Sequence, residues 1–121
     1  MAYDDQNIFA KILRGEIPCK RIYEDEFVLS FYDINPQKKV HALVIPKGKY
    51  TDLDDFSSNA SSEEMVGLLK GINTVAKKLG ISTDTGKGYR ALANISEDGG
   101  QEVPHLHFHL FGGEKIGKMV Q

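Results

Sequence analysis

The sequence predicts an α+β domain in which a five-stranded antiparallel sheet packs with one short and one long helix. Five segments rich in β-branched and aromatic residues, joined mostly by short turn-forming stretches, predict the strands. One long segment, residues 62–79, carries apolar side chains every three or four positions, as an amphipathic helix does. The chain has 121 residues, of which 40% are hydrophobic, so residues 1–121 are expected to form a single domain with its own core.

The first half of the chain predicts a short helix followed by three strands. The helix covers residues 8–13, with Asn7 as its N-cap and with Gly15 and Pro18 after its end. The predicted strands are residues 21–24, 27–32 and 40–45, of which the first two form a hairpin. Between the second and third strands, Asn35-Pro36 favours a loop.

The second half predicts the long helix and two further strands. Ser61 and Glu64 match a capping box at the start of the helix, and its apolar stripe is interpreted as packing surface. After the helix we expect a strand at residues 88–94, a glycine-rich loop at 96–101, a last strand at 102–111 and a polar tail at 114–121.

Composition excludes several classes of protein. With 17 acidic and 15 basic residues, the net charge of −2 gives no broad attraction to nucleic acid or to an anionic membrane. Cys19 is the only cysteine, so neither an intrachain disulfide nor a cysteine-based zinc knuckle is expected. The first residues lack an apolar signal segment, and no stretch approaches the roughly 20 apolar residues of a membrane span. We therefore expect a cytoplasmic protein.

The last predicted strand carries three of the chain's four histidines, at positions 105, 107 and 109. Side chains alternate along a strand, so the three histidines share one face, and Leu106, Phe108 and Leu110 share the other. The apolar face is expected to meet the long helix. The histidine face then points away from that core, toward a cleft, solvent or a ligand, and we interpret the cluster as an active site.

Metal binding is one possible use of these histidines. Neighbouring members would have Cα atoms ~6.6 Å apart, and His105 and His109 would be ~13 Å apart, whereas metal–nitrogen bonds are only ~2.1 Å long. All three therefore cannot share one ion. A metal site would need two of them together with His41 or a carboxylate, and the sequence has no HExxH or CxxC motif to complete one.

Phosphoryl chemistry is the alternative that we prefer. A neutral imidazole is a good nucleophile near neutral pH, and its neighbours can donate protons or bind phosphate oxygens. The segment Asp98-Gly99-Gly100-Gln101, just before the histidines, can turn tightly and direct backbone N–H groups at an anion.

The sequence from His105 to Phe111, HLHFHLF, has the pattern His-φ-His-φ-His-φ-φ (φ, apolar) that is characteristic of the histidine triad superfamily. The resemblance extends over most of the chain, and Gly112-Gly113 resembles the nucleotide-binding (Hint) branch. It also includes the segments Ile8-Phe9, Gly15 to Pro18, Phe31 to Gln37, His41 to Lys47 and Gly99 to Gln101. The resemblance implies an antiparallel five-stranded fold that dimerises into a continuous sheet, and a metal-independent purine nucleoside phosphoramidase or related nucleotidyl hydrolase that needs no cofactor.

The resemblance also implies a role for each site residue. His107 would attack the α-phosphorus of a phosphoramidate or acyl-nucleotide such as an AMP–amine conjugate, His105 and His109 would assist, and His41 would support the nucleophile. Asp33 would bind the ribose hydroxyls. The base would lie among Phe9, Ile12, Ile17, Phe31 and Ile34. The phosphate would lie near Asn94, Gly100, Gln101, Glu102 and Val103.

Some of these residues also have purely structural explanations. Asp33 can cap a turn, His41 can be a hydrogen-bonded core residue, and Asn94 can close a turn. The sequence departs from relatives at Asn7 and Ala10, where many bacterial members have zinc-binding cysteines, at Glu102, and in a tail without tryptophan. A dinucleoside polyphosphate hydrolase, or a nucleotide-binding regulatory protein with incidental hydrolysis, therefore remains an alternative.

Overall fold

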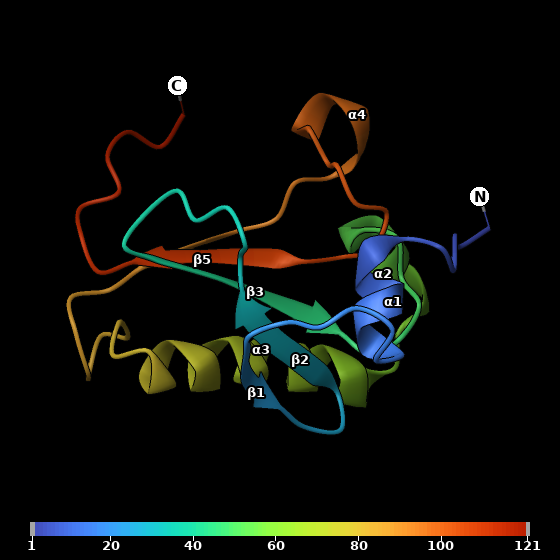
Figure 1. Ribbon diagram of the computed structural model, residues 1–121, viewed down its shortest axis with the longest axis horizontal. Coiled ribbons are helices and arrows are strands. Elements are labelled where there is room, and N and C mark those ends of the chain that lie inside the picture. The colour runs from blue at the N-terminus through green and yellow to red at the C-terminus, as the bar shows by residue number, and fades with distance from the viewer. Residues whose placement is uncertain (1, 121) are drawn as a thin grey trace.

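The computed structural model describes residues 2–120, and its centre is a five-stranded antiparallel sheet (Figure 1). Along the sheet the strands follow the order β1-β2-β3-β5-β4. Their bounds are β1 Arg21–Glu24, β2 Val28–Tyr32, β3 Val40–Pro46, β4 Arg90–Leu92 and β5 Phe108–Gly112. The predicted α+β class with an antiparallel five-stranded sheet is therefore confirmed.

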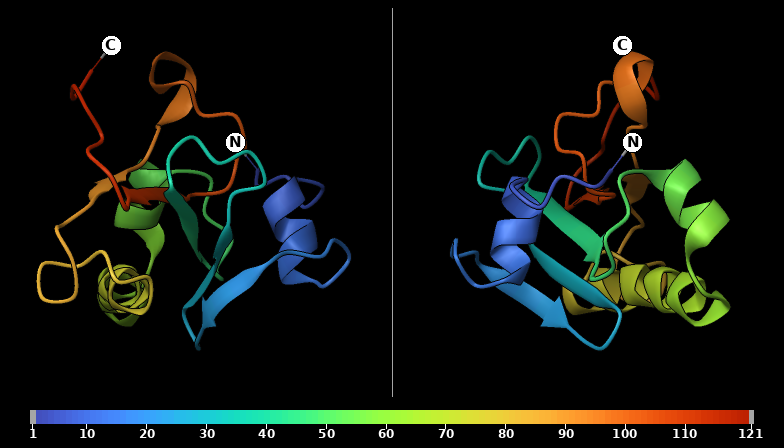
Figure 2. Two further views of the ribbon diagram at one scale, coloured as in Figure 1. Left: turned by 60° about the vertical axis from the view of Figure 1, so that its left-hand side comes forward. Right: turned by 90° about the vertical axis from the view of Figure 1, so that its right-hand side faces the viewer.

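The long helix and the short N-terminal helix lie on opposite faces of the sheet (Figure 2). The helices are α1 Ile8–Leu13, α2 Leu53–Asn59, α3 Ser62–Lys78 and α4 Ser96–Gly99. The predicted caps are confirmed, because the Asn7 side chain accepts a hydrogen bond from the Ala10 amide and Ser61 forms a capping box with Glu64. No helix within residues 2–120 has both the length and the apolar character needed to cross a membrane.

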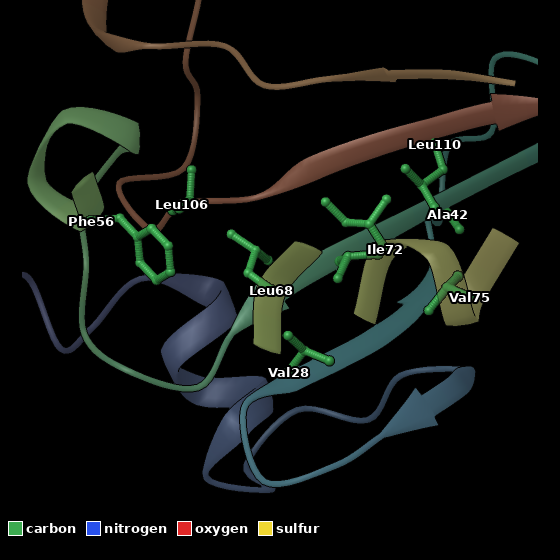
Figure 3. Close-up of a cluster of buried hydrophobic side chains, with 9 residues drawn as sticks. Val28, Ala42, Phe56, Leu68, Ile72, Val75, Leu106 and Leu110 are labelled. Carbon is green, nitrogen blue, oxygen red and sulfur yellow. The ribbon is translucent and has the colours of Figure 1, made fainter. Parts of the chain in front are cut away.

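The main core lies between α3 and one face of the sheet (Figure 3). The α3 stripe packs against alternate residues of the strands and against the apolar members of the histidine motif, as predicted. Full burial of a valine, leucine, isoleucine or phenylalanine side chain contributes about 1.5–3 kcal/mol to stability. A Cβ at Gly71 of α3 would lie 2.8 Å from a methyl carbon of Val28, so this glycine allows the helix to approach β2 closely. The cluster contains Val28, Ala42, Val44, Phe56, Leu68, Ile72, Val75, Leu106 and Leu110.

A smaller core covers the other face of the sheet, where α1 packs. Phe9 of α1 meets Phe31 of β2 edge to face, with ring centroids 5.7 Å apart. In the β3–β5 ladder, His41 lies opposite Phe111 and Leu43 lies opposite His109. Because Leu43 belongs to this smaller core, His41 and His109 share its face, and the α1 face is the one that carries the histidines.

Two helices are missing from the sequence prediction of one short and one long helix. In α2, Asp52 caps the first turn by accepting a hydrogen bond from the Asp55 amide. The helix is short and Phe56 is its one buried residue, so its sequence shows no apolar periodicity that would predict a helix. In α4, which was expected to be part of a glycine-rich loop, Ser96 has a positive φ of 58° and Gly100 closes the helix with a φ of 76°.

Two predicted strands are too long. The strand expected at residues 88–94 is reduced to β4, and the strand expected at 102–111 begins only at Phe108. Pro104 has no N–H to donate, and the His105 amide bonds back to the Val103 carbonyl, so the chain turns here. The Leu106 amide then donates to the Tyr50 carbonyl in the loop after β3.

Candidate active site

Of the three motif histidines only His109 lies in β5, which corrects the expectation that all three occupy one strand. His105 and His107 belong to the segment that leads into β5. The alternation nevertheless holds, because Leu106 and Leu110 are buried in the main core while the histidines lie on the other side. The hydrogen-bond partners of each imidazole then define its tautomer, since a carbonyl can only accept and an amide can only donate.

His105 is fully buried, and both of its ring nitrogens have partners. Its Nε2–H donates to the Pro46 carbonyl at the end of β3, at 2.9 Å. Its Nδ1 must then carry a lone pair, and it accepts from the Tyr3 hydroxyl at 2.5 Å. Burial lowers the pKa of His105 to about 4, so this ring is neutral at physiological pH.

His107 has one nitrogen bonded and one free. Its Nδ1–H donates to the His105 carbonyl at 2.8 Å, so its Nε2 carries the lone pair and has no hydrogen-bond partner within residues 2–120. Every buried side-chain nitrogen and oxygen in this range has a partner, so this nitrogen must be reached by solvent. Burial lowers the pKa of His107, which keeps the lone pair available at neutral pH. The Phe9 ring packs against the imidazole edge to face, at 4.9 Å between centroids.

His41 and His109 form a directed hydrogen-bonded pair. The backbone amide of Gln37 donates to Nδ1 of His41 at 3.1 Å, which places the His41 proton on Nε2. This Nε2–H donates to Nδ1 of His109 at 2.9 Å, with a carboxylate oxygen of Asp33 3.4 Å from the same nitrogen. His109 therefore carries its own proton on Nε2. Burial, together with the charges of His107 and His41, lowers the pKa of His109 to about 4.

This arrangement places a nucleophile beside a proton donor. The rings of His107 and His109 have centroids 5.1 Å apart, one with a free lone pair at Nε2 and the other with an N–H at Nε2. An electrophile bound between them can be attacked from one ring and protonated from the other.

Two hollows meet at the His41–His109 pair. One, of about 710 Å³, is lined by residues that include Cys19, Asp33, Ile34 and His41. The other, of about 300 Å³, is lined by residues of the tail and of β4 together with Asn94 and His109. A larger hollow of about 960 Å³ lies between the loop after α3 and the tail, but it is lined by no histidine, so we place the chemistry elsewhere.

Comparison with known proteins agrees with this geometry. The sequence model of the HIT domain matches residues 14–116. The chain belongs to the histidine triad (HIT) family. It is 52% identical over 118 residues to an uncharacterised 13.2 kDa HIT-like protein of Azospirillum brasilense, covering 98% of this chain and 94% of that protein. It is 39% identical over 117 residues to the purine nucleoside phosphoramidase of Escherichia coli, covering 96% and 94% of the two chains.

Solved HIT structures share the fold. The HIT family hydrolase from Clostridium thermocellum has a TM-score of 0.85 and 38% identity, and the match covers 98% of this chain and 99% of that one. A histidine triad protein from Clostridium difficile matches with a TM-score of 0.80 and 40% identity, covering 98% of both chains. Family membership and these neighbours support a hydrolase.

One cluster in this HIT chain has the composition of a metal site. Ligand atoms of Asp33, His41 and His109 lie within 4.8 Å of one another, so this cluster contains one triad histidine, whereas the metal site considered from the sequence needed two of them with His41 or a carboxylate. A metal-binding histidine normally donates its second N–H to an acceptor. His41 instead accepts from the Gln37 amide at Nδ1, so its Nε2 is protonated and faces the cluster as a donor. The donor set therefore suits a hydrogen-bond relay better than a cation.

The apolar residues predicted to surround the base fall into a buried group and a more exposed group. Phe9 and Phe31 are buried in the smaller core, with Ile12 packed against it. Ile34 is 85% exposed and lines the 710 Å³ hollow, while Ile17 is half-buried in the loop after α1.

The residues predicted to surround the phosphate lie before the histidines. Gln101 is fully used by the protein itself, because its side chain bonds the Ser96 amide and the carbonyls of Thr51 and Val103. Glu102 is exposed. Its negative charge raises the pKa of His107, but this effect is smaller than the lowering caused by burial. Gly100 is exposed at the end of α4.

Several residues of the site were missed by sequence reasoning. Tyr3 bonds His105 from 102 positions away, the Gln37 amide orients His41, and the Phe111 ring stacks parallel to His109 at 5.7 Å. Phe111 could have been found from the strand alternation, which places it on the histidine face. No local pattern points to Tyr3, because its partner is distant in the sequence.

Proposed function

We propose that the protein hydrolyses purine nucleoside phosphoramidates, or acyl-nucleotides, at the α-phosphate through a covalent nucleotidyl-histidine. The observation that carries the proposal is the pair of free nitrogens: the lone pair on His107 Nε2 beside the N–H on His109 Nε2. The 39% identity to a purine nucleoside phosphoramidase supports the choice of substrate.

In the first step, Nε2 of His107 attacks the α-phosphorus and the bond from phosphorus to the leaving nitrogen breaks. The leaving nitrogen takes the Nε2 proton of His109, and the Nε2–H of His41 that donates to His109 Nδ1 stabilises the charge left on that ring. The attacked ring becomes positively charged, and the His105 carbonyl that accepts from its Nδ1–H stabilises that charge. The charges of Asp33 and Glu102 act in the same direction, since both raise the pKa of His107.

In the second step, water attacks the phosphorus, the nitrogen–phosphorus bond to His107 breaks, and the nucleotide leaves. His109 lies beside the reacting centre to accept the proton of the attacking water. Both steps use the lone pair of His107 and the Nε2 proton of His109, and we propose that no cofactor is needed.

We propose that the nucleoside and the phosphate of the substrate bind at different parts of the site. The 710 Å³ hollow takes the nucleoside, with Asp33 accepting hydrogen bonds from the ribose hydroxyls and Ile34 covering the base. Phe9, Ile12, Ile17 and Phe31 form the apolar surroundings of the base. Asn94, Gly100 and the Val103 backbone hold the phosphate, next to Glu102. Since the polar atoms of Gln101 are already occupied, we propose that it shapes this segment without contacting the nucleotide.

We also propose that two copies pair edge to edge through β4. This strand lies at one of the two edges of the sheet, where its outer N–H and C=O groups can pair with a second copy. A mass measurement in dilute solution is expected to give a dimer, and a monomer would contradict this part of the proposal.

The test of the proposed function is turnover of adenosine 5′-phosphoramidate by the wild type and by His107→Ala, each with and without a chelator. We expect wild-type turnover that resists the chelator, and none in the variant. Full activity of His107→Ala would overturn the role of His107, and loss with chelator alone would restore the metal interpretation. Tight AMP binding without wild-type turnover would instead indicate a nucleotide-binding protein.

A further inference from the structure

We propose that Tyr3 is a positioning residue of the active site, whose hydroxyl holds His105 and, through the His105 carbonyl, sets the ring of the nucleophile. The proposal rests on the function proposed above. It concerns a residue that lies outside the histidine motif and outside the region matched by the HIT domain, which begins at residue 14.

The contact between Tyr3 and His105 is built from two interactions. The hydroxyl donates to Nδ1 of His105 at 2.5 Å, and the two rings meet edge to face at 5.6 Å and 74°. The second nitrogen of His105 is used by the Pro46 carbonyl, so Tyr3 satisfies the one remaining polar atom of a fully buried ring. Partial burial raises the pKa of Tyr3, so the phenol stays protonated and remains a donor.

The segment that carries Tyr3 is held in place by two contacts of Asp5, on its C-terminal side. Asp5 forms an ion pair with Lys49 at 2.8 Å, and its carbonyl accepts from the Arg14 guanidinium at 2.7 Å. Lys49 lies shortly after the end of β3, where Pro46 accepts from His105. Tyr3 is therefore tied to the same strand end that orients the other side of the His105 ring.

His105 transmits this restraint to the nucleophile through its backbone. The His105 carbonyl accepts from Nδ1–H of His107 at 2.8 Å, and this bond leaves the lone pair of His107 on Nε2. Without the Tyr3 hydroxyl, Nδ1 of His105 would be a buried acceptor without a donor, which is costly. The ring and its backbone would shift to recover a partner, and the carbonyl that orients His107 would move with them.

The variant that tests this is Tyr3→Phe, which keeps the ring and its packing but removes the hydroxyl. A matched control is Tyr23→Phe, which removes the hydroxyl that donates to Asp25 at 2.8 Å in the β1–β2 hairpin. We expect the single-turnover rate constant for adenosine 5′-phosphoramidate to fall about tenfold in Tyr3→Phe, with half-saturation within about twofold of the wild type. Tyr23→Phe is expected to match the wild type in both.

A spectroscopic readout separates positioning from a general loss of structure. In protein with ¹⁵N-labelled histidine, we expect the wild type to show a single His107 tautomer protonated at Nδ1, and Tyr3→Phe to show a shifted His105 Nδ1 signal and a second His107 tautomer. Tyr23→Phe is expected to reproduce the wild-type spectrum.

An unchanged His107 spectrum in Tyr3→Phe would overturn the proposal. So would a rate constant equal to that of Tyr23→Phe, or a loss confined to half-saturation. The spectra decide the role of Tyr3 even if the wild type does not turn over this substrate, so failure of the proposed function and failure of this inference are distinguishable.

Discussion

His105 and His109 flank the central histidine at equal distances along the chain, but their surroundings differ in almost every respect. His105 lies before β5, is fully buried, and has both ring nitrogens bonded, to Tyr3 and to the Pro46 carbonyl. His109 lies within β5, is half-buried, and uses one nitrogen on His41 while the other has no hydrogen-bond partner within residues 2–120.

The difference shows how a repeated residue acquires separate tasks. An imidazole with both nitrogens engaged can orient its neighbours but cannot exchange a proton without breaking a bond. An imidazole with a free N–H can exchange its proton without breaking a bond to the protein. The motif supplies three similar rings, and their hydrogen-bond partners make His105 a structural member and His109 the candidate proton donor.

The largest expected effect concerns His109→Gln, which removes the proton donor. Turnover of phosphoramidates with alkylamine leaving groups is expected to fall by about 10²- to 10³-fold, as for loss of a general acid. With an electron-withdrawing aniline as the leaving group, the loss should be much smaller because that nitrogen needs less protonation. Rates measured across a series of leaving amines check this, and an equal loss for all of them would contradict the role of His109.

The second prediction concerns stability. His105→Ala leaves a cavity and orphans both the Tyr3 hydroxyl and the Pro46 carbonyl, so the free energy of unfolding should fall by about 3 kcal/mol. His109→Ala, at a half-buried position, should cost under about 1 kcal/mol. Urea unfolding of the two variants measures the difference. Equal losses would remove the distinction between the two flanking histidines.

The third prediction concerns the pH dependence of stability. The unfolded chain protonates His105 near its ordinary pKa of 6.5, whereas the folded chain does so only near 4. Between these values the unfolded state binds more protons, so stability is full above pH 6.5 and falls as the pH drops toward 4, by about 2–3 kcal/mol at pH 4.5 for this ring. His105→Gln should show a shallower pH dependence of the unfolding free energy, and an unchanged slope would contradict the burial of a neutral His105.

The smallest expected effect concerns Asp33, at the His41–His109 side of the site. Asp33→Asn should raise KM for adenosine 5′-phosphoramidate about tenfold by weakening the ribose contact, with kcat changed less. The 2′-deoxy substrate serves as the control. Its KM should be raised for the wild type and rise little further in the variant, whereas additive losses would show that Asp33 does not contact the ribose.

Local signals in the sequence predicted the elements whose determinants are close together. Asn7 and Ser61 cap helices by bonding amides three residues away, and the α3 stripe repeats within one segment, so these elements were correctly located. The HLHFHLF pattern likewise identified the histidine face, because alternation is a property of extended backbone.

What the sequence did not predict depends on contacts between distant segments. The start of β5 is set by the turn at Pro104 and by the bond from the Leu106 amide to Tyr50, not by the strand-like composition of residues 102–107. The partners that fix the tautomers, Tyr3, Gln37 and Pro46, come from three other parts of the chain. No pattern within the motif distinguishes His105 from His109.

The most direct test of the account is to capture the nucleotide on His107. The wild type is mixed with excess adenosine 5′-phosphoramidate, quenched with strong base, which phosphorus–histidine bonds survive, and its peptides are mapped by mass. In parallel, the configuration at phosphorus is followed with a chiral phosphorothioate analogue. We expect an adenylyl group on His107 and overall retention of configuration, since two displacements each invert the phosphorus. Turnover with inversion, or an adduct on another histidine, would contradict it.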